Sequence, residues 1–367
     1  MILDVGAVGH GGICIAHAPD GRAVFVRHAL PGERVEVTVT EERPSYLRAD
    51  AVDVLRPSPH RVQPPCPWAG PGRCGGCDWQ HVALDEQRQL KATVVADQLR
   101  RIAGIDRHVE VEAVPGDAAG LGWRTRIRLA VGPDGVAGLH RHRSHEIEPI
   151  GECLIAHPEL PVASVVSQRW PDVDGVDLTV SDAETAVGRT WRIPQGGFWQ
   201  VHPGAPQALA DAVAEYADVD ASDSCLDLYC GVGLFTAVLA ARAPSGRVIG
   251  VESSAAAAAA ARSNLADLGN VTIHTGRVDR WLVRAKPRAD VVVLDPPRKG
   301  AGRAVVDGIA ATAARRVVHV ACDPSALARD ISLLSDHGYR LEAMRAFDLF
   351  PMTAHVECVA LLVNGSR

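Results

Sequence analysis

The second half of the chain alternates apolar strand-like runs with helical segments, and this alternation constrains the fold more than any other feature. Runs suited to buried strands lie at 226–228, 248–252, 291–294 and 317–320. An alanine-rich segment, residues 254–268, is a predicted helix between the second and third runs. Strands that alternate with helices imply an α/β fold with a doubly wound, mostly parallel sheet.

A glycine turn follows the first of these strands. Gly231 and Gly233 form a Gly-x-Gly step, which lets a ligand approach the backbone closely at the carboxyl edge of a sheet. Glu252 ends the next strand, where a carboxylate can accept hydrogen bonds from both hydroxyls of a ribose. Phe235 and Thr236 occupy the region of the third glycine of a dinucleotide fingerprint. A nucleoside such as S-adenosylmethionine therefore fits better than NAD, and a purely structural turn is the other alternative.

Reactive side chains follow the third and fourth strands. Asp295 opens an Asp-Pro-Pro-Arg sequence, and Arg298 stands where methyltransferases of exocyclic amines carry an aromatic residue, which indicates another target atom. Cys322 follows the fourth strand. A thiolate there can add to carbon 6 of uracil and make carbon 5 nucleophilic towards a methyl sulfonium. Glu357 is a candidate base for the proton on carbon 5. For Cys322 taken alone, a buried core thiol is the alternative.

The first half of the chain has a different texture. Residues 1–57 are predicted to form short strands with glycine bends, which fits a five-stranded barrel of the oligonucleotide-binding kind or another small β-domain. Residues 58–80 are rich in Pro, Gly and Cys and are predicted to be a loop. A helix is expected at 82–103, and strands return at 121–200.

The chain has nine cysteines, and an odd number without a signal peptide argues against a disulfide framework. Cys66, Cys74, Cys77 and Cys153 form a candidate metal site, in which Cys74 and Cys77 flank two glycines. Four sulfur ligands suit either tetrahedral zinc or a four-iron cluster.

Composition limits the function classes. Hydrophobic residues make up 47% and charged residues 22% of the chain, as in globular proteins, and no apolar run is long enough to span a membrane. The first residues lack the pattern of a signal peptide, so we expect a cytoplasmic protein that does not associate with membranes. The net charge of -6 argues weakly against a generic nucleic-acid binder.

Arginines nevertheless form a candidate surface for RNA phosphates. Arg124, Arg126 and Arg128 alternate along a predicted strand and so share one face. Arg141 and Arg143, on a predicted return strand at 138–143, could extend the same stripe, although an ordinary solvated face is the alternative.

The chain resembles the RNA uracil-5-methyltransferase family, especially its iron–sulfur members, over nearly its whole length. The resemblance is carried by the segments 31–33, 74–81, 123–126, 198–201, 295–298, 322–324 with 327–330, and 350–357. The family usually has Asn at positions 202 and 234, and Ser and Asn around the cysteine, where this chain has His202, Leu234, Ala321 and Asp323.

The resemblance implies a Rossmann-like S-adenosylmethionine methyltransferase domain at 201–367. It implies an OB-like TRAM barrel at 1–57 and a central α+β RNA-binding domain with the iron–sulfur loop at 58–200. Cys322 would be the nucleophile and Glu357 the base. The cofactor would contact Gln200, Tyr229, Glu252 and Asp295 as well as Gly231. The four cysteines would hold a [4Fe–4S] cluster, with zinc as the alternative.

The expected reaction is methylation of carbon 5 of an unstacked uridine by a monomeric enzyme. The resemblance favours 23S ribosomal RNA as the substrate, with transfer RNA as the alternative. A non-catalytic RNA-binding or ribosome-assembly factor is the competing class, and the pair Cys322 and Glu357 argues against it.

Overall fold

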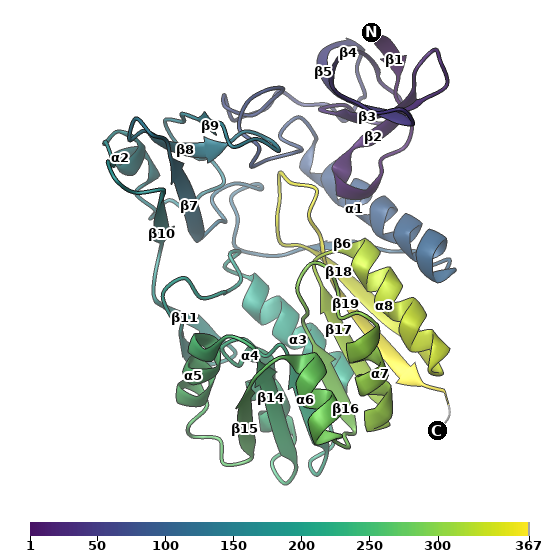
Figure 1. Ribbon diagram of the computed structural model, residues 1–367, viewed down its shortest axis with the longest axis vertical. Helices are drawn as coiled ribbons and strands as arrows, with labels where there is room; N and C mark the ends of the chain where they lie inside the picture. Colours follow the sequence, from purple (N-terminus) through teal and green to yellow (C-terminus); the bar gives the residue numbers. More distant parts are fainter. Residues whose placement is uncertain (366–367) are drawn as a thin grey trace. The chain divides into compact units, whose positions relative to one another are not determined.

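A computed structural model describes residues 1–365 (Figure 1). Internal contacts divide the chain into two compact units, each assembled from separate segments. Unit 1 comprises Met1–Val94, Gly116–Val180 and Phe350–His355. Unit 2 comprises Val95–Pro115, Ser181–Leu349 and the chain from Val356 onward.

Unit 1 begins with a five-stranded barrel. Its strands are β1 (Ile2–Asp4), β2 (Cys14–His17), β3 (Ala23–Arg27), β4 (Arg34–Glu42) and β5 (Tyr46–Arg56), in the order β1-β4-β5-β3-β2. Alternate residues of β3 and β4 point into an apolar core that includes Val24, Val26 and Val35. Backbone hydrogen bonds that join Ile15 to Gly6 and Ala7 connect β2 to the chain just after β1. The predicted small barrel is therefore present.

The rest of unit 1 contains a long loop, a helix and a second sheet. The loop between β5 and α1 (Leu84–Gln98) contains no helix or strand, as predicted, and α1 continues as a π-helical turn, Leu99–Ala103, which belongs to unit 2. The second sheet has the order β10-β7-β8-β9. Its elements are β7 (Arg126–Val131), β8 (Ala137–His140), β9 (Ile147–Glu148) and β10 (Gly175–Thr179), with the short helix α2 (Val162–Val166) beside β8.

The predicted arginine stripe needs correction. Strand β8 ends at His140, so Arg141 and Arg143 lie in the following turn and not on a neighbouring strand. Arg128 donates hydrogen bonds to Asp174 and Asp177, and Arg141 binds Glu146 and Glu148. Strand β7 begins at Arg126, so Arg124 precedes it, and of the predicted stripe Arg126 and Arg128 lie on this strand. Sequence spacing could not show the carboxylates of Asp174 and Asp177, which come from another segment.

Unit 2 is a three-layer α/β fold built on an eight-stranded sheet of order β15-β14-β13-β16-β17-β19-β18-β6. The strands are β6 (Val111–Ala113), β13 (Ser224–Leu228), β14 (Arg247–Glu252), β15 (Val271–Thr275), β16 (Val291–Leu294), β17 (Arg316–Ala321), β18 (Tyr339–Asp348) and β19 (Glu357–Asn364). The helices are α3 (Ala205–Ala217), α4 (Leu234–Arg242), α5 (Ala255–Asn264), α6 (Val278–Ala285), α7 (Arg303–Thr312) and α8 (Pro324–Asp336), and a hairpin of β11 (Ala183–Ala186) and β12 (Arg189–Arg192) precedes them.

The topology of this sheet creates a natural ligand crevice. The parallel part of the sheet consists of β13, β14, β15, β16 and β17. From the central pair β13 and β16, successive strands are added on opposite sides: β14 and β15 beside β13, and β17 beside β16. Helices α6, α7 and α8 pack side by side in front of the sheet and α3 lies behind it (Figure 1). Ligands of such folds bind beyond the carboxyl ends of the strands at the reversal point, here between β13 and β16.

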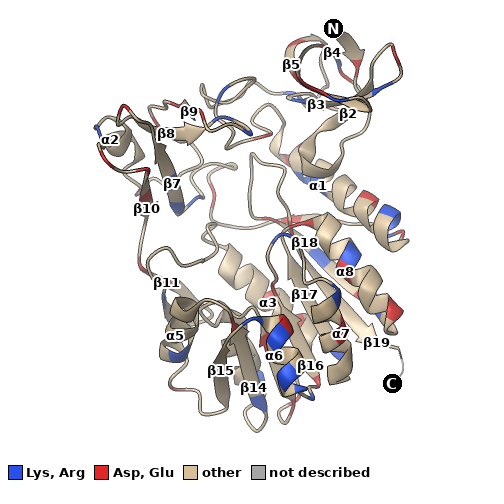
Figure 2. Cartoon of the chain, in the orientation of Figure 1, with Lys and Arg blue, Asp and Glu red and all other residues tan. Residues whose placement is uncertain are grey.

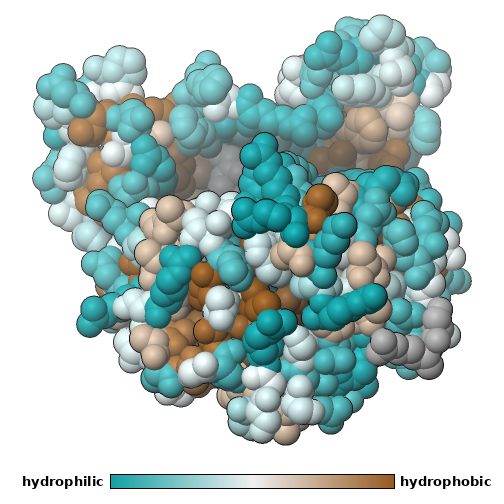
Figure 3. All heavy atoms as spheres, turned by 60° about the horizontal axis from the view of Figure 1, so that its bottom comes forward, coloured by the Kyte–Doolittle hydropathy of each residue, from teal (hydrophilic) through white to brown (hydrophobic). Residues whose placement is uncertain are grey.

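The surface carries mixed charge. Acidic and basic residues both occur along α6 and α8 (Figure 2). In the space-filling view, polar side chains interrupt the hydrophobic areas (Figure 3). Within residues 1–365, no helix combines the length and the apolar character that a membrane span needs.

Candidate active site and cysteine cavity

The predicted cofactor residues Tyr229, Gly231 and Asp295 lie at the reversal point of the sheet. Tyr229 directly follows β13 and Asp295 directly follows β16, and these two strands are parallel neighbours. The backbone N–H of Asp295 donates to the carbonyl of Leu228 at 3.2 Å, which joins the two strand ends. The structure therefore brings together at one edge residues that are far apart in the sequence.

The glycine turn has the conformation that its sequence suggested. Tyr229, Gly231 and Gly233 all have left-handed φ values, of 66°, 54° and 101°. A Cβ atom on Gly233 would lie 2.7 Å from the side chain of Leu265, whereas one on Gly231 would meet nothing within 4 Å. Gly233 is thus required by packing, and Gly231 leaves its backbone open to a ligand. The positive φ of the non-glycine Tyr229 is a strained conformation of the kind that concentrates at functional sites.

Glu252 ends β14 and faces this turn. Its carboxylate accepts hydrogen bonds from the N–H of Gly231 at 3.0 Å and from the N–H of Ser254 at 2.6 Å. The side chain is half-buried, so its oxygen atoms are fixed in direction while part of the group stays accessible. A fixed, partly exposed carboxylate beside a glycine turn is suited to binding hydroxyl groups of a ribose.

Cys322 and Glu357 lie side by side at the same edge, although they are distant in sequence. Strands β17 and β19 are antiparallel, with Ala321 opposite Cys358. Cys322, one residue beyond β17, therefore lies beside Glu357, the first residue of β19. Asp295, which follows the neighbouring strand β16, completes the cluster.

Burial shifts the titration of this cluster. Desolvation, together with the negative charges of Glu357 and Asp295, raises the pKa of the Cys322 thiol to about 11. Desolvation and the charge of Asp295 raise the pKa of Glu357 well above its usual value, and desolvation raises that of Asp295 to about 7. The positive charge of Arg298 acts in the opposite direction on both Cys322 and Glu357. The cluster therefore holds its protons more tightly than exposed groups would, and Arg298 favours its anionic forms.

A buried pair that we did not predict supports the loop after Arg298. His319 on β17 and Asp330 on α8 are both buried, and their Nε2 and Oδ2 atoms lie 3.1 Å apart. Asp330 also accepts hydrogen bonds from the N–H groups of Ala301 and Gly302 at 2.7 and 3.0 Å. The pair thereby fixes the end of the loop that starts at Asp295. The sequence offered two signals for this pair: a histidine inside the apolar strand β17 and an aspartate within helix α8.

Two further positions show how the site is framed. Asp323, which departs from the family pattern, is the N-cap of α8 and accepts a hydrogen bond from the N–H of Ala326 at 2.8 Å. The side-chain amide of Asn264 donates to the carbonyls of Arg192 and Val232, so the β11–β12 hairpin lies beside the glycine turn. Gln200 lies in the segment between this hairpin and α3 and is half-buried. The described contacts do not join Gln200 to the other predicted cofactor residues.

Asp227, inside β13, is a second carboxyl group with a raised pKa. It is completely buried and accepts one hydrogen bond, from the hydroxyl of Thr236 at 2.6 Å. Its other oxygen, Oδ1, is buried without a hydrogen-bond partner among the described residues. Desolvation is the largest cause that raises its pKa to about 7. An ionised carboxylate at this position is costly because one oxygen has lost water and gained no donor.

We expect Asp227→Asn to stabilise unit 2 at alkaline pH. A carboxyl group whose pKa is raised on folding contributes full stability below its unfolded pKa, near 3.8, and loses that contribution as pH rises through about 7. Asparagine does not ionise, so the free energy of unfolding should rise by about 2–4 kcal/mol at pH 8 and by much less at pH 5. Urea unfolding at both pH values, with the exposed Asp336→Asn as control, measures this. An equal change at both pH values would contradict the explanation.

The four predicted metal ligands line one cavity in unit 1. Cys66, Cys74, Cys77 and Cys153 all border a cavity of about 40 Å³, together with apolar side chains such as Leu139 and Ile150. Negative charge on Cys66 or Cys153 raises the pKa of both Cys74 and Cys77, so the four sulfur atoms lie within electrostatic range of each other. In the described part of the chain, however, no group of three or more His, Cys, Asp or Glu side chains is arranged to hold a metal ion.

Known proteins share this architecture. Residues 2–52 match the TRAM domain, residues 284–364 match the tRNA (Uracil-5-)-methyltransferase family, and residues 205–320 match the methyltransferase small domain. The structure of a Pyrococcus abyssi tRNA (uracil-54, C5)-methyltransferase in complex with S-adenosyl-L-homocysteine aligns with a TM-score of 0.72 and 24% identity, over 99% of this chain and 100% of that one.

Close relatives in sequence carry consistent names. A Streptomyces avermitilis protein described as an uncharacterized RNA methyltransferase is 44% identical over 425 residues, which cover 100% of this chain and 98% of that protein. A second such protein, from Bifidobacterium longum, is 38% identical over 96% of this chain and 94% of its own length. The chain therefore belongs to the TRAM-containing RNA uracil-5-methyltransferase family and is an RNA methyltransferase.

Proposed function

We propose that this enzyme methylates carbon 5 of a uridine in RNA through a covalent bond between Cys322 and carbon 6 of the uracil. The observation that carries the proposal is the position of Cys322 beside Glu357 and Asp295, at the carboxyl edge of the sheet next to its reversal point. A nucleophile with an adjacent carboxylate at this edge suits a reaction that needs both a thiolate and a base.

The proposed reaction has three steps. The thiolate of Cys322 adds to carbon 6, which turns the ring into an enolate with a nucleophilic carbon 5. S-adenosylmethionine, when bound, supplies the methyl group as a sulfonium electrophile. After carbon 5 has accepted the methyl group, which leaves S-adenosyl-L-homocysteine, Glu357 removes the remaining proton of carbon 5. The bond between Sγ and carbon 6 then breaks, which frees the thiolate and leaves 5-methyluridine in the RNA.

The electrostatics of the cluster support these roles. The raised pKa of Glu357 makes its carboxylate a stronger base than an exposed glutamate. Since the pKa of Cys322 is about 11, the residue is a thiol at neutral pH in the free enzyme. Arg298 lowers the pKa of both groups and so stabilises the thiolate that must form.

We further propose that Tyr229, Gly231, Glu252 and Asp295 hold the cofactor at the reversal point, with Gln200 approaching from the hairpin side. Glu252 would accept hydrogen bonds from the hydroxyl groups of the ribose, and the backbone at Gly231 would leave space for the ligand. The fixed direction of the Glu252 carboxylate supports this assignment most strongly.

Substitution Glu252→Gln should weaken binding of S-adenosylmethionine about 10- to 100-fold. Hydrogen bonds to a charged acceptor contribute about 1.5–3 kcal/mol, and glutamine keeps the size of the side chain but removes its charge. Isothermal titration calorimetry with S-adenosyl-L-homocysteine measures the change. Glu110→Gln, at a side chain that is 86% exposed, is the matched control. Unchanged affinity in the Glu252 variant would remove this residue from the site.

For the substrate, we propose 23S ribosomal RNA, with transfer RNA as the alternative. The resemblance to iron–sulfur members of the family supports the first, and the name of the matched family model supports the second. Mapping 5-methyluridine in both RNAs from a strain that lacks the gene decides between them. A missing modification in 23S RNA is the expected result, a loss confined to transfer RNA would establish the alternative, and no loss in either would overturn the proposal.

A monomeric, cytoplasmic enzyme with the domain division 1–57, 58–200 and 201–367 remains our prediction.

We propose that Cys66, Cys74, Cys77 and Cys153 hold a [4Fe–4S] cluster. Convergence of all four on one largely apolar cavity supports this, since such clusters bind four thiolates in protected sites. Anaerobically purified protein should contain about four iron and four sulfide ions per chain, and Cys66→Ala should lose them. Cys225→Ala, in β13, is the control. Zinc without iron would establish the alternative metal, and neither metal would overturn the site.

A further inference from the structure

The loop that joins β18 to β19, residues 349–356, leads directly to the proposed base, yet most of it belongs to unit 1. Phe350–His355 form the third segment of unit 1, whereas both flanking strands belong to unit 2. The chain therefore leaves unit 2 after β18 and returns just before Glu357, the first residue of β19. Because only Val356 separates this segment from Glu357, its conformation bears directly on the position of the base.

Gln87, on α1, ties this segment to two other parts of unit 1. The side chain is fully buried. Its Oε1 atom accepts the backbone N–H of Met352 at 2.7 Å, and its Nε2 atom donates to the carbonyls of Trp79 and Val82 at 3.2 and 3.0 Å. One amide group thus joins α1, the loop between β5 and α1, and the segment before the base. These contacts need one acceptor and two donors, which an amide has and an apolar side chain or a carboxylate lacks.

Met352 has a strained backbone that these contacts hold in place. Its φ value of 67° lies in the left-handed region, which is unfavourable for a residue with a side chain. Both of its backbone groups are bonded within unit 1: the N–H to Gln87, and the carbonyl to the N–H of Trp79 at 3.0 Å. Strained residues persist where their surroundings over-determine them, and they concentrate at functional sites. The bond from Gln87 is therefore one of those that keep Met352 in this conformation.

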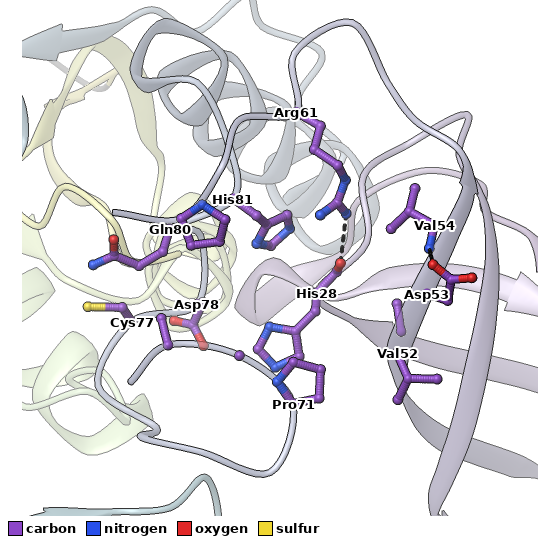
Figure 4. Close-up of a pocket in the computed structure, with 14 residues that line it drawn as sticks. His28, Val52, Asp53, Val54, Arg61, Pro71, Cys77, Asp78, Gln80 and His81 are labelled. Carbon is purple, nitrogen blue, oxygen red and sulfur yellow. Dashed lines mark hydrogen bonds between the residues drawn. The ribbon is translucent and has the colours of Figure 1, made fainter. Parts of the chain in front are cut away.

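Two further hydrogen bonds hold the segment near its ends. Lys91, one turn further along α1, is fully buried and donates from Nζ to the carbonyl of Phe350 at 3.1 Å. The N–H of Ala354 donates to the carboxylate of Asp78 at 3.3 Å. Figure 4 shows this aspartate on the lining of a cavity of about 300 Å³ in unit 1. The segment before the base is thus held along its length by side chains of unit 1.

A base in this position has to be placed accurately. A general base must lie within hydrogen-bond reach of the proton that it removes, about 2.6–3.2 Å between heavy atoms. On one side of Glu357 the backbone is fixed by the pairing of β19 with β17 and β18. On the other side the chain comes from Met352 with no helix or strand between them. The contacts of Gln87 therefore fix the chain from this second side.

We infer that Gln87 is a positioning residue for proton removal, because it fixes the segment through which the chain enters β19 and so holds Glu357 where it can take the proton of carbon 5. The inference rests on the proposed function, in which Glu357 acts after methyl transfer. Gln87 acts through the backbone of Met352 and not through contact with the reacting atoms. Its loss should slow the last step of the reaction and leave formation of the covalent adduct unchanged.

Hydrogen exchange of the full-length protein tests the contact without any chemistry. Gln87→Met keeps the volume of the side chain but removes its three bonds to backbone groups. The amides of residues 352–357 should then exchange about 10-fold faster, the effect of one lost hydrogen bond. Gln87→Glu retains an acceptor for Met352, so it should cause a smaller increase and serves if the first variant does not fold. Gln89→Met, at an exposed position of α1, is the matched control and should cause none. Unchanged exchange in both Gln87 variants would overturn the inference.

The individual steps of the reaction separate positioning from general damage. Turnover by Gln87→Met should fall about 10- to 100-fold, since a displacement of about 1 Å can cost that much. Protein linked to labelled RNA should accumulate, because proton removal has become the slow step. Glu357→Gln should stall as this adduct, and adding Gln87→Met to it should leave the rate of adduct formation unchanged. A fall in that rate by the same factor as turnover would show a general structural effect and overturn the inference.

The inference and the proposed function can fail separately. If Glu357→Gln forms no adduct, the proposed role of the base fails, and the role of Gln87 fails with it. If Glu357→Gln forms the adduct but Gln87→Met neither accumulates it nor loses turnover, only the inference about Gln87 fails. Gln87→Glu, which keeps one of the bonds, should recover part of the turnover that Gln87→Met loses, and Gln89→Met should keep all of it.

Discussion

Cys322→Ala should reduce methylation of RNA by about 10⁴-fold or more, the order of effect seen when the nucleophile of a covalent enzyme is removed. Without the thiolate, carbon 5 of uracil is not activated, and the other thiols that the described residues place near this edge, those of Cys230 and Cys358, are buried. The assay is transfer of the labelled methyl group from S-adenosylmethionine to unmodified ribosomal and transfer RNA made by transcription.

Two measurements separate this loss from damage to the fold. The variant should bind S-adenosyl-L-homocysteine with unchanged affinity, because Cys322 follows β17 whereas the proposed ribose acceptor, Glu252, ends β14 on the other side of the reversal point. The control Cys225→Ala removes a buried thiol at the opposite end of β13 and should keep most of the activity. An alanine variant that still methylates RNA at a comparable rate would eliminate the covalent mechanism.

The sequence allowed prediction of the groups that local pattern determines. Apolar runs indicate where the strands end, and glycines indicate the turn because they tolerate positive φ. Tyr229, Glu252 and Asp295 were therefore predicted to lie at one edge of the sheet. Cys322 followed from the same rule, because parallel strands bring their carboxyl ends together. The amino-terminal β-barrel and the loop that carries the cysteines were also predicted from local composition.

What sequence could not supply depends on pairing between distant segments. Strand β19 returns antiparallel beside β17, and only that register brings Glu357 next to Cys322. The contact of His319 with Asp330, and the carboxylates that engage Arg128 and Arg141, likewise join residues with no shared periodicity. The bonds of Gln87 to Met352 and to the loop before α1 join three separate segments, and no local pattern indicates them.

Glu357→Gln should convert the enzyme into one that stalls as a covalent protein–RNA adduct. Glutamine has the same shape but cannot accept the proton of carbon 5, so the bond between Sγ and carbon 6 does not break after methyl transfer. Turnover should fall by about 10²–10⁴-fold, the usual contribution of a general base. A band of protein linked to labelled RNA should survive denaturing electrophoresis, and its mass should include the transferred methyl group.

The fold should tolerate this change, which makes the result interpretable. Glu357 is 3% exposed and its pKa is raised well above the usual value of 4.5, so its contribution to stability is fully present below the unfolded pKa and is lost as pH rises through the raised folded pKa. A neutral glutamine avoids that loss, and the variant should be at least as stable as the unsubstituted protein at pH 8. Adding Cys322→Ala to the same chain should abolish the adduct, and the exposed Glu110→Gln should form none. An adduct that persists without Cys322 would assign the bond to another residue, whereas a fully active Glu357→Gln enzyme would show that a different group removes the proton.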